Sequence, residues 1–183
     1  MKSGVLIPQL TSNIRYDTWV RIYSATLTEA ATSLTISGLN GDIAKEFKLE
    51  ARIVNGYDGA AFFLVRPNNV STASNYGYQQ LVGLNDTYEA ARGTYAAYYI
   101  GYAGALNNLS QGSLIIQATS GYVRTAINEY ARTITGTTVT AIVVSGQSWN
   151  NTADNITQFN IISDQISGLG IGSQITLWSR NHR

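Results

Sequence analysis

The chain has 183 residues, 12 of them basic and 11 acidic, and its formal net charge is +1. This length suits one domain, which buries roughly 70% of the surface that its unfolded chain exposes, so the core needs no support from disulfides or metals. The near-balance of charge lacks the basic pattern of nucleic-acid-binding proteins and of polybasic membrane-surface proteins, so we expect neither kind of partner.

Few side chains suited to catalysis are present. The chain contains no cysteine, and its one histidine is His182. Thiolate chemistry, iron–sulfur clusters and cysteine-ligated zinc are therefore excluded, and a Ser–His–Asp triad or multi-histidine metal site is not expected. No acidic residue stands in a context that predicts the converging carboxylate pair of a glycosidase. We expect no enzymatic activity, no cofactor and no metal.

The residues themselves favour strands and turns. Ser, Thr, Asn and Gln make up nearly a third of the chain, which also contains 12 tyrosines and 17 glycines. Thr, Tyr, Val and Ile favour strands, whereas Gly and Asn favour the turns between them. No segment has the apolar length of a signal peptide or a membrane span. The composition predicts a soluble all-β protein with a hydroxyl- and amide-rich surface, which is typical of extracellular or virion proteins.

Residues 1–16 are predicted to form an N-terminal arm, followed by one domain over 17–183. The arm is apolar at Val5, Leu6, Ile7 and Leu10, but Pro8 interrupts the run. Three alternatives remain open for it: a first edge strand, an extension that docks on a neighbouring subunit, or a disordered tail.

The domain reads as ten or eleven short strands with a turn signal every 8–14 residues. Residues 46–55 alternate apolar and polar side chains, as expected for a sheet with one wet face, while 85–92 is read as a loop. This spacing predicts an antiparallel sandwich or barrel. The expected core contains Phe47, Leu49, Ile53, Phe63, Val143, Ile161 and Leu177.

Two turn regions resemble ligand sites but are read as structural. Asn40, Asp42 and Asp58 offer oxygen ligands for calcium, yet the acidic loop pattern of a calcium-binding hand is absent. The glycines of the segment 168–172 are followed by a strand pattern, whereas a phosphate-binding loop would precede a helix. We expect ordinary turns at both places.

A tyrosine cluster is the best candidate for binding. Seven tyrosines fall within 27 residues, namely Tyr76, Tyr78, Tyr88, Tyr95, Tyr98, Tyr99 and Tyr102. Tyrosine gives a large amphipathic contact at low entropic cost and is enriched in interfaces. Three interpretations stay open: half-buried tyrosines covering a sheet, a subunit interface, or a platform that stacks on glycans.

The second half of the chain resembles the jelly-roll structural proteins of tailed bacteriophage virions. The resemblance rests on Trp149-Asn150-Asn151-Thr152, on the strand pattern 155–161 and on the segment 168–178, which reads GLGIGSQITLW. Earlier matches are the segment 36–42 with Glu46-Phe47-Lys48-Leu49, where Phe47 replaces the usual tyrosine, and Arg66-Pro67-Asn68-Asn69. It covers about residues 17–179 and implies an antiparallel jelly-roll β-sandwich.

Members of this group occur as capsid decoration (cement) proteins, head fibres and tail or receptor-binding parts, and the pattern carries no catalytic residues. The resemblance leads us to expect a virion protein on the outer capsid surface that binds the major capsid protein, forms a homotrimer and stabilises the shell. Its interface would include the apolar arm residues and the tyrosines Tyr76, Tyr78, Tyr88, Tyr95 and Tyr99. The alternative is a carbohydrate-binding module on the tail or head that recognises a surface glycan.

Overall fold

The chain folds into two antiparallel β-sheets packed face to face. The computed structural model describes residues 18–84 and 87–181; the arm residues Val5, Leu6, Ile7, Pro8 and Leu10 lie outside this part. Strands account for 62% and helices for 4%, which confirms the expected fold class. No helix in the described ranges is long and apolar enough to cross a membrane.

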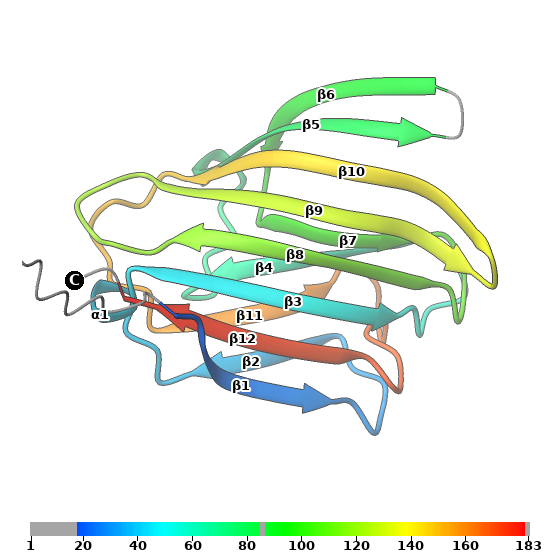
Figure 1. Cartoon of the computed structure of the whole chain (residues 1–183), viewed down its shortest axis with the longest axis horizontal. Coiled ribbons are helices and arrows are strands. Elements are labelled where there is room, and N and C mark those ends of the chain that lie inside the picture. Colours follow the sequence, from blue (N-terminus) through cyan, green and yellow to red (C-terminus); the bar gives the residue numbers. More distant parts are fainter. Residues whose placement is uncertain (1–17, 85–86, 182–183) are drawn as a thin grey trace, which may run out of the picture.

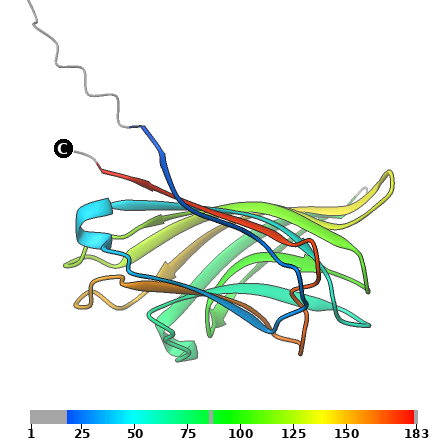
Figure 2. The same ribbon diagram turned by 90° about the horizontal axis from the view of Figure 1, so that it is seen from below.

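The large sheet has eight strands in the order β1-β12-β3-β8-β9-β10-β5-β6 (Figure 1). Their bounds are β1 Val20–Thr26, β12 Gln174–Arg180, β3 Glu46–Val54, β8 Leu109–Gln117, β9 Arg124–Thr135, β10 Thr138–Trp149, β5 Tyr76–Leu84 and β6 Thr87–Tyr95. The small sheet has the order β2-β11-β4-β7, with β2 Ser33–Ser37, β11 Gln158–Ser163, β4 Ala61–Pro67 and β7 Tyr98–Ala103. Figure 2 shows the two layers, with β1 and β12 side by side in the upper one.

Eight of these strands form the expected jelly roll. The order β1-β12-β3-β8 faces β2-β11-β4-β7, and successive strands from β1 to β4 alternate between the sheets. Two hairpins, β5–β6 and β9–β10, are inserted into this framework and widen the large sheet beyond β8. The fold is therefore a jelly-roll sandwich with one sheet twice as wide as the other.

The core lies between the sheets and contains every residue expected there. Phe47, Leu49, Ile53, Phe63, Val143, Ile161 and Leu177 are each at most 1% exposed. The Phe47 and Phe159 rings meet edge to face at 5.3 Å between centroids, which joins the two layers at the centre. Trp149 is fully buried as the last residue of β10.

One segment predicted to be a loop is a strand, and the three turn residues with oxygen ligands lie in turns or at a helix end. Residues 87–92, read as a loop, belong to strand β6. Asn40 caps the short helix α1 (Gly41–Ala44) by accepting the Ile43 N–H, and Asp42 accepts the Ser120 N–H at 2.7 Å, so both side chains have the structural roles expected of turns. Asp58 lies exposed in a turn.

The glycine-rich segment 168–172 is a turn that leads into β12, as expected. Gly172 has a φ of +83°, and a Cβ on Gly168 would lie 2.0 Å from the Ser163 Oγ. The glycines therefore serve backbone conformation and close packing.

Candidate functional site

The outer face of the large sheet, meaning the side that points away from the small sheet, is divided into two chemically different halves. The strand register places side chains of neighbouring strands in rows across this face; one row runs Trp178, Lys48, Ile115, Ile127 and Gly146. The row begins with aromatic and charged groups on β12 and β3 and becomes apolar at β8. The neighbouring rows change in the same direction.

The apolar half is a patch centred on the inserted hairpins. We define the apolar patch as Leu81, Ile115, Ile127, Ile142 and Val144, which are between 36% and 67% exposed. Ile115 lies opposite Ile127, and Val144 lies opposite Leu81; the two pairs are diagonal neighbours, because Ile127 lies opposite Gly146 and Val144 opposite Glu129. Burying a fully exposed Ile or Leu side chain contributes about 1.5–3 kcal/mol, and contiguous apolar patches mark interaction surfaces. The patch therefore favours association with a partner.

The polar half is hollowed into a groove of about 680 Å³. Its polar lining consists of Glu50, Arg52, Gln111, Ser113, Glu129, Gln174 and Thr176. These groups combine hydrogen-bond donors and acceptors of both charges, the chemistry that orients a polar ligand.

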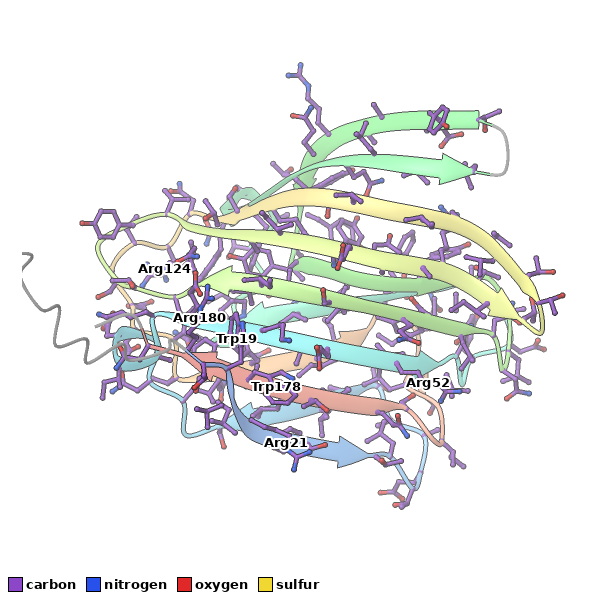
Figure 3. The ribbon with its side chains drawn as sticks, in the orientation of Figure 1. Trp19, Arg21, Arg52, Arg124, Trp178 and Arg180 are labelled. Carbon is purple, nitrogen blue, oxygen red and sulfur yellow. The ribbon has the colours of Figure 1, made fainter. Side chains whose placement is uncertain are left out.

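An aromatic corner lies at one end of β3 (Figure 3). The Lys48 ammonium lies 5.5 Å from the Trp19 ring centroid and 5.3 Å from that of Trp178, and the Arg180 guanidinium lies 4.6 Å from that of Trp19. The Trp178 Nε1–H donates to Glu50 at 2.8 Å, which connects this corner to the polar groove. Sequence reasoning singled out neither tryptophan as a site residue, because the partners that gather them come from distant strands.

Two carboxylates from different strands line the groove. Glu50 on β3 and Glu129 on β9 lie on either side of Ser113 in the same row. The hydrogen bond from Lys48, assisted by the one from Trp178, outweighs burial and lowers the pKa of Glu50. A lowered pKa opposes a role as general acid. Within residues 18–84 and 87–181 no group of three His, Cys, Asp or Glu side chains is placed to hold a metal ion.

The tyrosines of the cluster occupy three different environments. Tyr76 is 1% exposed and donates its hydroxyl hydrogen to the Val70 carbonyl. It therefore belongs to the core, whereas the sequence analysis placed it in a surface interface. Tyr78 and Tyr95 are half-buried and pack on Tyr99 with ring centroids 5.3 and 4.9 Å away. Tyr88 alone among the candidate tyrosines projects freely, being 91% exposed beside the apolar patch.

Side chains of the inserted hairpin close the edge of the small sheet. At Tyr99 on the edge strand β7, the backbone N–H donates to the Gln147 Oε1 at 2.6 Å, and the carbonyl accepts from the Gln147 Nε2 at 3.0 Å and from Asn128. The inward positions of β9 and β10 are therefore partly polar, whereas their outward positions carry Ile127, Ile142 and Val144. This inversion produces the apolar patch.

The comparison with known proteins assigns the chain to no family. No family model and no curated protein sequence matches the chain. Among solved structures, the galectin LEC-6 of Caenorhabditis elegans is 8% identical with a TM-score of 0.36, covering 87% of this chain and 96% of its own. The endo-β-1,4-glucuronan lyase of Trichoderma reesei is 11% identical with a TM-score of 0.25, covering 92% and 90%. Such scores establish no relationship, and the fold assignment rests on the strand order.

Proposed function

We propose that this protein is a structural component of a tailed-phage virion that decorates the outer capsid surface and stabilises the assembled shell. The observation that carries the proposal is the apolar patch, a face whose burial needs a protein partner. The resemblance of its strand and turn motifs to phage jelly rolls supplies the class of partner, the major capsid protein. A subunit that binds only the assembled lattice shifts the equilibrium towards the intact shell by mass action.

The proposal is tested by the binding of purified protein to empty, tail-free shells. Val144→Glu places a charge in the apolar patch opposite Leu81 and away from the groove lining, and we expect at least about a tenfold loss of affinity because a buried interface would have to desolvate that charge. Ile171→Glu is the matched control, since Ile171 is 64% exposed and lies in the turn before β12, outside the patch. Equal shell binding by both variants and the unmodified protein would contradict the proposal.

The polar groove is the observation that favours a second candidate, a carbohydrate-binding module. Its charged and amide side chains adjoin Trp178, and such a combination suits a hydroxyl-rich ligand. A glycan array separates the two candidates. Reproducible binding that Arg52→Ala abolishes and Val144→Glu leaves intact would favour the module, whereas shell binding with the opposite dependence would favour decoration.

A further inference from the structure

The two sheets have four edge strands, and three of them carry features that discourage pairing with another chain. The β7 edge is partly occupied by Gln147 and Asn128, as described above. The β2 strand has only five residues, and β1 contains a register shift between Arg21 and Tyr23. Short edges, irregular edges and occupied edges are all recognised ways to prevent edge-to-edge association.

The remaining edge, β6, carries no such protection. It has nine residues, eight of them exposed, and pairs with β5 without a register shift. It contains neither proline nor lysine, and its charged residues are Glu89 and Arg92. Figure 1 shows β6 at the margin of the large sheet, and no described strand pairs with its far side. A long, regular, exposed edge is a template for an added strand.

We propose that residues 5–10 of a neighbouring copy add to this edge as an antiparallel strand. The segment reads VLIPQL, is uncharged and carries four large apolar side chains. In an edge strand, every second residue turns its N–H towards the neighbour. If Val5, Ile7 and Gln9 face β6, Pro8 falls in the outward set, where its missing N–H costs no ladder bond.

The side chains of β6 suit this occupant. Tyr88, Ala90 and Arg92 point to the outer face, while the opposite face carries Glu89, Ala91 and Gly93. Small residues on β6 leave room for the large apolar side chains of the incoming strand on both faces. On the outer face the addition would extend the apolar surface from Leu81, which lies opposite Ala90.

The reach of the chain requires the donor to be another copy. From β1 to β6 there are seven strand spacings, or roughly 34 Å at about 4.8 Å each along the sheet. The nine residues 11–19, which separate the segment from β1, span at most about 32 Å when fully extended. The chain's own segment therefore falls short of its own β6. A head-to-tail exchange of this kind closes into a ring when the rotation between subunits permits, and the inference does not depend on whether the shell is the partner.

The absence of cysteine makes the contact directly testable. Two single-cysteine proteins, Ile7→Cys and Ala91→Cys, are tagged differently, mixed and oxidised. The proposed register places Ile7 opposite Ala91, where the Cα atoms of opposed residues lie within the range of a disulfide, so we expect a disulfide between the two variants. Ile7→Cys with Thr35→Cys on the exposed edge strand β2 is the matched control. Cross-linking no stronger than in the control would overturn the proposal.

A second experiment uses the alternating direction of the N–H groups along the added strand. Ile7→Pro removes an N–H that faces β6, whereas Leu6→Pro removes one that points away. Sedimentation equilibrium should show oligomers for the unmodified chain and a dissociation constant about threefold to tenfold larger for Ile7→Pro than for Leu6→Pro, the effect of one lost hydrogen bond. A monomeric unmodified chain, or equal constants for the two variants, would refute the exchange. Shell binding by such a monomer would leave the proposed decoration function standing.

Discussion

Arg124 offers the sharpest test of how the core is held together. It is 1% exposed on β9, its guanidinium lies 5.7 Å from the Trp149 ring centroid, and it donates to the carbonyls of Tyr122, Asn151 and Asp154. No carboxylate forms an ion pair with it within the described residues. Burial lowers the pKa of Arg124, so the cost of desolvating its charge is not fully offset by Asp42 and its other charged neighbours.

We expect Arg124→Met to destabilise the protein by about 3–5 kcal/mol. A hydrogen bond to a charged group contributes about 1.5–3 kcal/mol, and three are lost, while removing the buried charge returns several kcal/mol. Methionine keeps the length and the contact with Trp149, so the change isolates the donors. For a chain of 183 residues the expected fall in Tm is roughly 6–20 °C.

Urea unfolding followed by tryptophan fluorescence measures this free energy. Arg21→Met is the control, because Arg21 is exposed on β1 and its loss should change stability by no more than about 0.5 kcal/mol. A loss below about 1 kcal/mol for Arg124→Met would refute the reasoning, since it would mean that the cost of burying the charge equals the gain from its three hydrogen bonds.

Three further predictions concern packing and pH. Phe63→Ala should cost about 3–5 kcal/mol in urea unfolding, because Phe63 is fully buried, and a loss below about 1 kcal/mol would contradict its place in the core. Gly112→Ala should destabilise the protein by about 1–3 kcal/mol or more, because the new Cβ would lie 2.4 Å from the Tyr130 Cβ and 2.5 Å from the Glu129 carbonyl oxygen. Gly146→Ala is the control: its new Cβ would meet nothing within 4 Å, so the change should be neutral or stabilising. Equal effects of the two substitutions would refute this account. Burial raises the pKa of Tyr130 to about 12, so the unfolded chain loses this proton first as pH rises, and Tyr130 alone should lower stability by roughly 1.4 kcal/mol per pH unit between the unfolded value of 10 and 12. Tyr76, Tyr98 and Tyr99, whose pKa values burial also raises, add to the slope, so Tyr130→Phe should make it shallower by that amount. Constant stability across that range, measured by urea unfolding, would oppose the assignment.

The strands that the sequence predicted well are those whose apolar side chains all face the core. In β3 the alternation of Phe47, Leu49 and Ile53 with charged residues coincides with the inward and outward faces, so both the strand and its orientation could be predicted. The same rule applied to β9 would place Ile127 inside, whereas it is 67% exposed and Arg124 and Asn128 point inward. Tertiary context decides here, because these polar side chains satisfy backbone groups on β7 and the loop after β10.

The candidate site could be predicted only in part. The sequence shows that the tyrosines are close together along the chain, but their spacing does not distinguish buried Tyr76 from exposed Tyr88. That difference depends on the face of the sheet to which each side chain points. The groove was missed because Glu50 and Glu129 belong to strands separated by many residues and meet only through the register of β8. The strand β6 was missed because its small and charged residues lack apolar alternation.

The pairing of β1 with β12 has a consequence for the order in which the chain assembles and opens. Val20 lies opposite Ser179, so this pair closes a loop that contains almost the whole chain, whereas β9 and β10 are joined by a tight hairpin. Loop closure costs more entropy for the longer loop, which places the hairpin early and β1 late in folding. With one neighbouring strand and mostly exposed residues, β1 should also exchange its amide hydrogens early in the native state. The N-terminal segment therefore leads into an edge strand that forms late, and release of β1 would add its seven residues to the reach of that segment.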